Sequence, residues 1–480
     1  MNKIQTIFKN IGLLLVSQII NLTFTTVYMI YTARYLGVSG FGLLSFALAF
    51  TGIFVVLTDL GLNTLTVREI SRDKSLTNKY FGNVLILKTI LTAFTIILIF
   101  LTLNILKYPQ NTAEVVYLIG LYTILGSFTG ICYSIFQSHE KMEYQSIGQI
   151  LNSVLMFSSI LVAIHLKFTV IGLSLIYFIV SFIVFIFSIL ICLWKFVLPK
   201  IEFDWIFLKS LIIKALPFGF TSIFVLIYYY IDTVMLSFML PNGNEIVGWY
   251  NAAYNIVIPL SFIPSIFFSS VFPVMANFYK TSHNSLKFTF ERSIRYMTII
   301  GVPIAVGITI LADKIILIAY GASYLPAAIA LQILVWSMAF IFVNTSFSVL
   351  LSSIDQQNIV AKVTGIAALF NIILNLILIP FYSFIGSSIA TTAADMLNFI
   401  IMLFILSKTK YKLHLVSFKY FIKVIISAVV MIVLLQILSD INLLENILIS
   451  SLGYTATFLL LKGMDNDDIQ ILKNLIKPIN

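Results

Sequence analysis

Four ionisable residues stand inside long apolar stretches of this 480-residue chain: Asp59, Lys88, Asp232 and Asp395. A fifth, Arg34, lies at the end of the first such stretch. Taking a charged side chain out of water is costly, so residues of this kind are kept where they pair, bind or move something. They are the first candidates for function. For Lys88 and Asp59 the structural alternative is a salt bridge between neighbouring helices.

Oxygen-bearing side chains recur at four-residue intervals in two later stretches, which hold Asn371 and Asn375, and Ser387, Thr391 and Asp395. On a helix this spacing places each set on one face. Together with Asp232 they offer the carboxylate, amide and hydroxyl oxygens that hard cations prefer. We therefore predict coupling to Na⁺ or H⁺ at these residues and no other cofactor. The alternative is hydrogen bonding between helices, worth about 0.6 kcal/mol for each bond.

The elements that carry these residues must be membrane helices. Apolar residues make up 60% of the chain and charged residues 10%, against about 25% charged residues in soluble domains. A soluble protein could not cover so much apolar surface. The composition excludes a soluble enzyme, a disordered protein and a disulfide scaffold, and it predicts an all-α polytopic membrane protein.

The apolar runs predict about fourteen transmembrane helices, because a helix needs roughly 20 residues to cross the hydrocarbon core. A β-barrel would instead show short alternating segments. The expected spans are 10–33, 41–66, 81–105, 114–137, 147–166, 170–194, 216–240, 248–276, 293–312, 326–352, 359–380, 384–407, 419–438 and 445–462.

The basic residues support this count. The chain has 29 Lys and Arg against 19 Asp and Glu. Most of the 29 fall in alternate loops, beginning with Lys3 and Lys9, continuing through Lys200 and ending with Lys473 and Lys477. The positive-inside rule then predicts a cell-membrane protein with both termini in the cytoplasm. Topology also explains the net charge of +10 without a nucleic-acid partner.

The chain repeats weakly after about 210 residues. Gly40 to Leu43 opens the second expected span, and Gly248 to Asn251 opens the eighth. We therefore predict a pseudo-twofold arrangement of two six-helix lobes, 1–200 and 216–410. Residues 201–215 are predicted to form a helix on the inner membrane surface or an extension of the seventh span. Two extra spans and a cytoplasmic tail fill 411–480.

Several segments, in this order and spacing, carry a family resemblance: TARYLGVSGFGLLSFALAF, DLGLNTLTVREIS, IFQSHEKMEYQ, YYYIDTVMLSFML and LFNIILNLILIPFYSFIGSSIAT. The chain resembles Wzx-type polysaccharide-repeat (O-antigen) flippases of the MOP superfamily. The resemblance implies a V-shaped central cavity and export of isoprenoid-diphosphate-linked oligosaccharides to the outer leaflet. It also implies work beside a polymerase and glycosyltransferases in making O-antigen, capsule or another surface polysaccharide.

The resemblance also assigns roles to particular residues. A diphosphate needs cations in a wet cavity, so Arg34, Lys88 with Asp59, and Arg295 are candidate substrate-binding residues, and Tyr31 is a ring on which a sugar could stack. The structural alternatives are snorkelling to the membrane interface for Arg34, a topology signal for Arg295 and an interfacial position for Tyr31.

A sodium site in lipid II flippases carries over by motif position to Asp232, Asn371, Asn375, Ser387 and Thr391. Asn375 stands where some relatives have an acid, which weakens the charge of the predicted site and leaves Na⁺, H⁺ or no ion open.

Two other functions fit the composition. A MATE-like cation-coupled multidrug exporter shares the architecture, although Lys88 and Arg34 disfavour a cavity for organic cations. A membrane glycosyltransferase or polymerase fits less well, because the expected outer loops are short and no metal-ligand spacing occurs. The two cysteines, Cys132 and Cys192, are expected to be small core residues.

Overall fold

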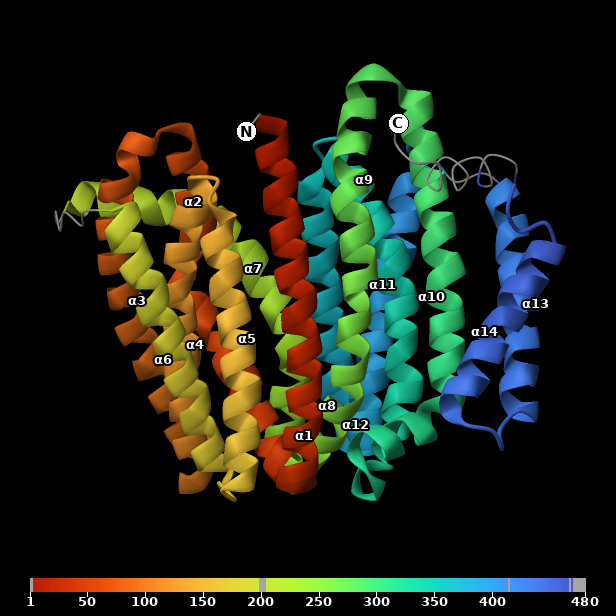
Figure 1. Ribbon diagram of the computed structural model, residues 1–480, viewed down its shortest axis with the longest axis horizontal. Helices are drawn as coiled ribbons and strands as arrows, with labels where there is room; N and C mark the ends of the chain where they lie inside the picture. The colour runs from red at the N-terminus through yellow and green to blue at the C-terminus, as the bar shows by residue number, and fades with distance from the viewer. Residues whose placement is uncertain (1–2, 198–203, 413–414, 466–467, 469–480) are drawn as a thin grey trace. The chain divides into compact units, whose positions relative to one another are not determined.

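The computed structural model describes residues 3–197, 204–412, 415–465 and 468 (Figure 1). In these residues all regular structure is helical. Lys200, Lys473 and Lys477, and residues 201–203 of the predicted linker, lie outside the described residues. The helices are α1 Lys3–Asp59, α2 Leu62–Arg72, η1 Lys74–Leu76, α3 Thr77–Ile105, α4 Gln110–Ser138, α5 Met142–His165, α6 Val170–Lys195, α7 Trp205–Met239, α8 Gly243–Val257, η2 Ile258–Ser261, α9 Phe262–Thr281, α10 His283–Tyr320, η3 Ala322–Tyr324, α11 Ala327–Ser353, α12 Gln357–Ser407, α13 Leu415–Ile437 and α14 Leu443–Leu460.

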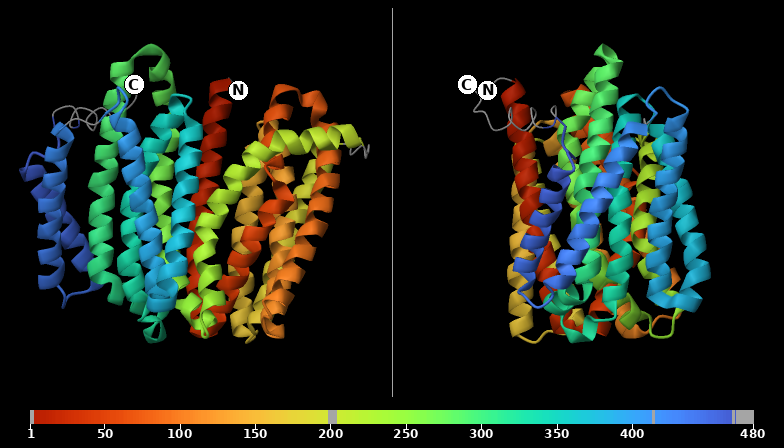
Figure 2. Two further views of the ribbon diagram at one scale, coloured as in Figure 1. Left: turned by 180° about the vertical axis from the view of Figure 1, so that it is seen from behind. Right: turned by 90° about the vertical axis from the view of Figure 1, so that its right-hand side faces the viewer.

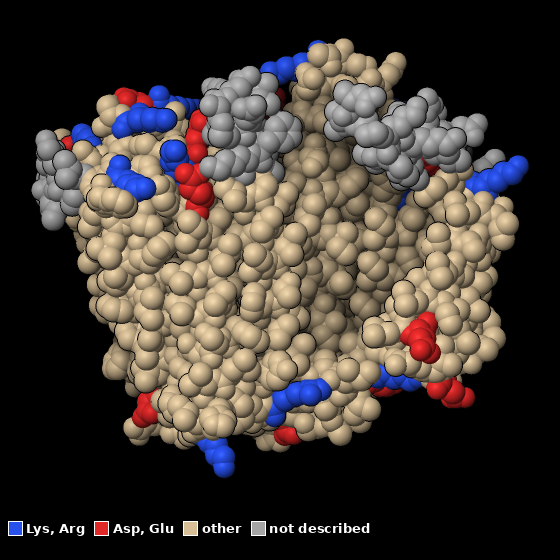
Figure 3. Space-filling model, viewed as in Figure 1, with Lys and Arg blue, Asp and Glu red and all other residues tan. Residues whose placement is uncertain are grey.

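Twelve stretches among the described residues are long and apolar enough to cross a membrane. On the face shown in Figure 3, basic and acidic side chains gather toward the two ends of the helices, with an uncharged band between them. Such a band is what a bilayer core demands of the surface that it touches. The predicted all-α polytopic membrane fold is confirmed.

Two of the helices, α1 and α12, contain a break in helical geometry. In α1 the break is at Gly37, with φ 68° and ψ 178°, and in α12 it is at Ser383, with φ 53° and ψ −137°. A glycine adopts positive φ without a steric penalty. Each break falls between two expected spans, 10–33 and 41–66 in α1 and 359–380 and 384–407 in α12. The exact count of about fourteen spans stays a prediction.

The chain divides into two compact units. The first comprises Met1–Ala252 and Ile372–Ser387, and the second comprises Ala253–Asn371 and Ser388–Asn480. These units follow packing, whereas the predicted lobes, 1–200 and 216–410, follow the sequence repeat. The lobe assignment therefore stays a prediction.

The first unit is held together by an apolar cluster drawn from α2, α3, α4, α6 and α7. Its largest members include Tyr80, Phe81 and Phe136, all fully or almost fully buried. Cys132 and Cys192 belong to the same cluster and are free thiols. The expectation that they are small core residues is confirmed.

Helix α7 begins inside the predicted linker and continues as one helix into the expected seventh span. Figure 2 shows it bent, with its first turns running across the ends of neighbouring helices. Pro217 lies inside the helix and removes a backbone hydrogen bond, which explains the bend. Leu208 and Leu211 pack into the apolar cluster, while Trp205 and Ile206 on the other side are 65% and 82% exposed. The location of this segment at the membrane surface stays a prediction.

The two glycine motifs that revealed the repeat lie against each other in the first unit. A Cβ atom added to Gly42 would lie 1.6 Å from the backbone oxygen of Asn244. A Cβ atom added to Gly248 would lie 2.2 Å from the backbone oxygen of Val38. Helices α1 and α8 therefore approach here through backbone atoms, as small residues allow in membrane proteins.

The second unit packs around α10 and α11. Its main apolar cluster includes Phe290, Phe347 and Met402, which come from α10, α11 and α12. A smaller cluster joins α10 to the C-terminal pair through Val306, Met431 and others. Together these contacts anchor α10, the helix that carries Arg292 and Arg295.

Candidate functional site

Lys88 on α3 is fully buried and forms a salt bridge with Asp59. This bridge is the structural alternative to substrate binding that the sequence left open. The Nζ atom of Lys88 lies 2.7 Å from Oδ1 of Asp59, and it also donates to the backbone oxygen and to Oγ of Ser127, at 3.0 and 2.9 Å. An ammonium group has three donors, so each has a partner in this conformation. Substrate binding by Lys88 stays a prediction and would require this arrangement to open.

Asp59 does more than neutralise Lys88. Its carboxylate accepts hydrogen bonds from the backbone N–H groups of Gly61, at 3.2 Å, and Asn63, at 3.3 Å, where α2 begins. A carboxylate stabilises the positive end of a helix dipole at this position. Asp59 is 26% exposed. One acidic side chain thus joins the end of α1, the start of α2 and the middle of α3.

Asp232 on α7 is 2% exposed and lies at the centre of a second polar cluster in the first unit. The hydroxyl of Tyr250 donates to Oδ2 and the amide of Asn375 donates to Oδ1, both at 2.6 Å. Asn375, whose segment belongs to the first unit, is fully buried. The predicted pair of Asp232 and Asn375 is therefore brought together, on α7 and α12. The analysis of the sequence did not single out Tyr250, although it belongs to the repeated motif at Gly248.

In the second unit, Asn371 donates to the hydroxyl of Thr391 at 3.4 Å. Asn344 on α11 donates to the backbone oxygen of Asp395 at 3.1 Å. Asp395 is 3% exposed and Thr391 is 3% exposed, so neither side chain faces lipid. In the first unit Ser387 is fully buried, and its Oγ atom has no hydrogen-bond partner among the described residues.

In each unit these residues carry the oxygen atoms that a small cation would need. The described residues contain no group of three or more His, Cys, Asp or Glu side chains that could hold a metal ion. A site formed jointly by Asp232, Asn371, Asn375, Ser387 and Thr391, with Asp395 nearby in sequence, stays a prediction.

The two candidates near the break in α1 are on the protein surface. Tyr31 is 50% exposed, and Arg34 is also exposed. A surface position is compatible with a membrane-interface role and with a role in a water-filled passage, so the substrate-binding role of both residues stays a prediction.

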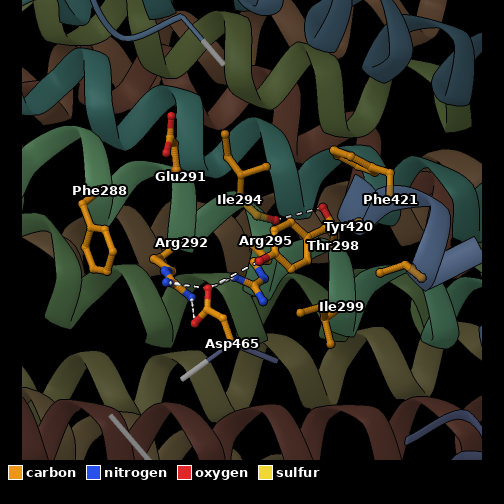
Figure 4. A pocket seen from close by; sticks show the side chains of 11 residues that line it. Phe288, Glu291, Arg292, Ile294, Arg295, Thr298, Ile299, Tyr420, Phe421 and Asp465 are labelled. Carbon is orange, nitrogen blue, oxygen red and sulfur yellow. Dashed lines mark hydrogen bonds and ion pairs between the residues drawn. The ribbon is translucent and has the colours of Figure 1, made fainter. Parts of the chain in front are cut away.

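Arg295 and its neighbour Arg292 form the densest charge cluster in the second unit, near the end of α10 that follows His283. Arg292 contacts both oxygens of Asp465, at 2.8 and 2.7 Å, and also pairs with Asp468. Arg295 lies 2.9 Å from Asp465 and 2.8 Å from Asp468. Figure 4 shows both guanidinium groups converging on Asp465. The two acids follow α14 and were not singled out from the sequence. Their i, i+3 spacing, matching that of the two arginines, was the available signal.

A pocket of about 160 Å³ adjoins this cluster. Phe288, Ile294, Ile299 and Phe421 supply apolar wall, and the polar wall includes Glu291 and the two arginines. The Arg295 guanidinium lies 3.5 Å from the ring centre of Tyr420, a cation–π contact that holds its plane in place.

The Asp465 carboxyl lies in a strongly perturbed environment. Partial burial raises its pKa, but hydrogen bonds from Arg292, from the backbone N–H of Asp468 and from Arg295 outweigh this effect. The net result is a pKa well below the ordinary value of 3.8. Asp465 is therefore ionised throughout the physiological range, and its charge is tied to both arginines.

Comparison with known proteins places this architecture. Residues 7–279 match the family model described as polysaccharide biosynthesis protein, which is more than half of the chain. The chain belongs to the polysaccharide biosynthesis protein family. Residues 217–377 of this family member also match the MatE family model. The resemblance to the MOP superfamily that the sequence motifs indicated is thus confirmed.

Three curated relatives of this family member come from archaea. An uncharacterized membrane protein of Methanocaldococcus jannaschii is 26% identical over 57% of this chain and 55% of its own length. A probable low-salt glycan biosynthesis flippase of Haloferax volcanii is 24% identical over 36% of each chain. A probable flippase of the same organism is 27% identical over 40% of each chain. The matches span roughly a third to a little over half of these relatives.

Solved structures show the same fold. The lipid II flippase MurJ in an inward closed conformation has a TM-score of 0.79 and 17% identity, over 98% of this chain and 100% of that chain. An inward-facing multidrug resistance MATE family transporter of the MOP superfamily has a TM-score of 0.65 and 16% identity, over 81% and 94%. This family member is therefore a multi-pass membrane protein with a MurJ- and MATE-like fold.

Proposed function

We propose that this chain is a flippase that moves isoprenoid-diphosphate-linked oligosaccharides from the inner to the outer leaflet of the cell membrane. The observation that carries the proposal is that the family match and the buried charges fall in the same region. The match to the polysaccharide biosynthesis family spans residues 7–279. This region contains Asp59, Lys88 and Asp232, three ionisable residues inside membrane helices. The names of the two Haloferax volcanii relatives support the same activity.

Alternating access is the proposed mechanism, in which two lobes expose a central passage first to one side and then to the other. Arg34, Arg295 and Lys88, the last after release from Asp59, serve as cations for the diphosphate, and Tyr31 offers a ring to the sugar. Outward movement of a negative diphosphate is favoured by an inside-negative potential, at about 2.3 kcal/mol per charge and 100 mV. Asp232, with Asn371, Asn375, Ser387, Thr391 and Asp395, provides Na⁺ or H⁺ coupling.

The product of this step would be used outside the membrane for O-antigen, capsule or another surface polysaccharide. A polymerase and glycosyltransferases are the expected partners, with the lipid-linked oligosaccharide as substrate. No catalytic residue is assigned, because the protein moves its substrate without changing covalent bonds.

The test is a flipping assay with the full chain in proteoliposomes. A fluorescent undecaprenyl-diphosphate oligosaccharide is placed in one leaflet, and a lectin added outside reports its arrival in the other. Protein-free vesicles set the background. We expect arrival to accelerate at least ten-fold over this background and to respond to an imposed potential. Equal rates with and without protein, for both undecaprenyl and dolichyl carriers, would exclude the proposal.

A second function, cation-coupled drug export, is favoured by one observation, the MatE match over residues 217–377, which includes Asp232. The same vesicles distinguish the two functions. Ethidium efflux that depends on Asp232, without glycolipid flipping, would assign the chain to drug export. Glycolipid flipping without ethidium efflux would assign it to glycan assembly.

A further inference from the structure

The short segment after α14 controls the charge of the pocket beside α10. The charged groups that line the pocket or pair directly with its arginines are Arg292 and Arg295, which are basic, and Glu291, Asp465 and Asp468, which are acidic. Their formal charges add to a single negative charge while both aspartates are in place. Without Asp465 and Asp468 the same groups add to a single positive charge. The segment therefore decides whether the pocket repels or attracts an anion.

The geometry of the arginines suits a phosphate group. Arg292 and Arg295 lie one helical turn apart and point at the same carboxylate (Figure 4). Arg292 is 12% exposed and Arg295 is 8% exposed. Arginine holds phosphate oxygens in the same paired manner as carboxylate oxygens. The four oxygens of Asp465 and Asp468 thus occupy positions that the oxygens of two linked phosphates can take.

The pocket also offers what an attached hydrocarbon chain would need. Phe288, Ile294 and Phe421 form apolar wall next to the guanidinium groups. The Nε atom of Arg295 is buried and has no hydrogen-bond partner among the described residues. A buried N–H without a partner is costly, and a bound phosphate oxygen would remove that cost. Glu291 points away from Asp465 in Figure 4, so it does not compete for the arginines.

The two aspartates are held by hydrogen bonds and ion pairs, which a ligand with phosphate oxygens could replace. Arg295 donates to the backbone oxygen of Gly463 at 2.5 Å, and the N–H groups of Asp465 and Asp468 each donate to the other's carboxylate at 3.0 Å. Asp465 is 33% exposed, so water and ions reach it. The ring of Phe288 contacts Arg292, and the ring of Tyr420 contacts Arg295 while its hydroxyl donates to Asp465 at 3.4 Å. Both rings belong to helices, α10 and α13, so they can support the arginines when the aspartates leave.

We propose that Arg292 and Arg295 form a binding site for a phosphate- or diphosphate-bearing isoprenoid lipid, and that Asp465 and Asp468 occupy this site as an internal substitute until the lipid displaces them. This inference deepens the proposed function, on which its choice of lipid rests. It makes Asp465 and Asp468 a latch that is released only by a ligand with both an anionic head and an apolar chain.

The test measures binding by the full chain in nanodiscs of neutral lipid. The probes are farnesyl diphosphate, inorganic diphosphate, farnesol and, as an ordinary anionic membrane lipid, phosphatidylglycerol. We expect wild type to bind farnesyl diphosphate weakly, the Asp465→Asn/Asp468→Asn variant to bind it at least ten-fold more tightly, and the Arg292→Gln/Arg295→Gln variant to lose binding. Glu69→Gln, which breaks the 2.7 Å pair with Arg68 in the first unit, is the matched control and should not change affinity.

Each probe has a decisive outcome. No gain in affinity for the double aspartate variant would overturn the latch. An equal gain for inorganic diphosphate would overturn the requirement for an apolar chain, and an equal gain for phosphatidylglycerol would overturn the preference for an isoprenoid diphosphate. Farnesol should show no gain, because it carries no anion for the arginines.

A second measurement needs no variant, so it stands even if the double aspartate variant fails to fold. Hydrogen exchange at the N–H groups of Asp465 and Asp468 should accelerate when farnesyl diphosphate binds wild type, because their mutual bonds break. Unchanged or slower exchange in the bound protein would overturn displacement. Flipping is assayed separately for wild type and the Asp465→Asn/Asp468→Asn variant. Equal flipping by the two proteins would support the proposed function and overturn the latch. Tighter binding of farnesyl diphosphate by the variant, with no flipping by either protein, would support the latch and overturn the proposed function.

Discussion

Lys88 on α3 and Asp59 at the end of α1 form a salt bridge of 2.7 Å inside the first unit, and Ser127 accepts the two remaining ammonium hydrogens. The sequence placed the two residues in neighbouring spans, but it left open whether they form a salt bridge or bind substrate. Because Asp59 also caps α2, the bridge ties together three helices that surround it.

Loss of Lys88 alone should destabilise the protein. Lys88→Ala leaves the Asp59 carboxylate largely buried without its counter-ion, and we expect a loss of about 3 kcal/mol in unfolding free energy. Lys88→Met/Asp59→Asn removes both charges and should recover most of that loss. Thermal unfolding of the purified variants in detergent measures both effects.

The double variant also tests the transport role of Lys88. We expect a folded Lys88→Met/Asp59→Asn variant to flip glycolipid several-fold more slowly, because the diphosphate would lose one of its proposed cations. Wild-type flipping by the folded double variant would show that the bridge between Lys88 and Asp59 is structural.

Asp232 is expected to set the ion dependence of transport. Asp232→Asn removes the carboxylate charge while keeping the shape that Tyr250 and Asn375 contact, so the variant should fold. We expect its flipping rate to fall several-fold and to lose its response to Na⁺ and pH. The rate is measured in proteoliposomes across a series of sodium concentrations and pH values, with the exposed Asp440→Asn as control. Wild-type behaviour at every condition would remove the ion site.

The Asp465 carboxyl should make stability dependent on acid. Its folded-state pKa lies below its ordinary value of 3.8, so the folded state binds the proton less readily than the unfolded state. The stabilisation is then complete above about pH 5 and is lost as the pH falls through 3.8 and below. Wild type should melt higher than Asp465→Asn from pH 5 to 8, and the difference should shrink below about pH 4. A constant difference down to pH 3 would contradict this.

The contact between Gly42 and Gly248 should not accept a methyl group. The added Cβ atoms would meet backbone oxygen at 1.6 and 2.2 Å, and overpacking of this kind costs about 3 kcal/mol or more. We expect Gly42→Ala and Gly248→Ala each to reduce the yield of folded protein severely. Gly126→Ala on α4 is the control, because its Cβ would meet nothing within 4 Å. Size-exclusion profiles and melting temperatures of the three variants measure the contrast.

Much of the fold could be predicted from the sequence, because a bilayer restricts the choice. Apolar length indicated the helices, and the gaps between expected spans include both breaks, at Gly37 and Ser383. The positive φ of Ser383 could not be predicted, since a serine gives no sequence signal for that conformation. The repeat was visible in the motifs Gly40 to Leu43 and Gly248 to Asn251, but nothing in the sequence indicated that the two motifs touch each other.

Part of the candidate site could also be predicted from the sequence, namely the residues that carry a charge. A charge inside an apolar run is visible without coordinates, so Lys88, Asp59 and Asp232 were found. Tyr250 was missed because a tyrosine is unremarkable in a membrane helix until its hydroxyl is seen on Asp232. Asp465 and Asp468 were missed because acidic residues beyond the last span look like ordinary solvent-exposed tail.

The glycine contact between α1 and α8 bears on how such a chain could have originated. If the halves descend from duplication of one ancestral gene, the two motifs began as the same codons, and in a homodimer of that ancestor each would have faced its own copy. A single mutation in the ancestral motif would have changed both sides of that contact at once. The close approach would therefore have been under double selection before fusion, and afterwards each motif could change alone, so that tight contacts now fall at different positions of the two motifs, Gly42 and Gly248.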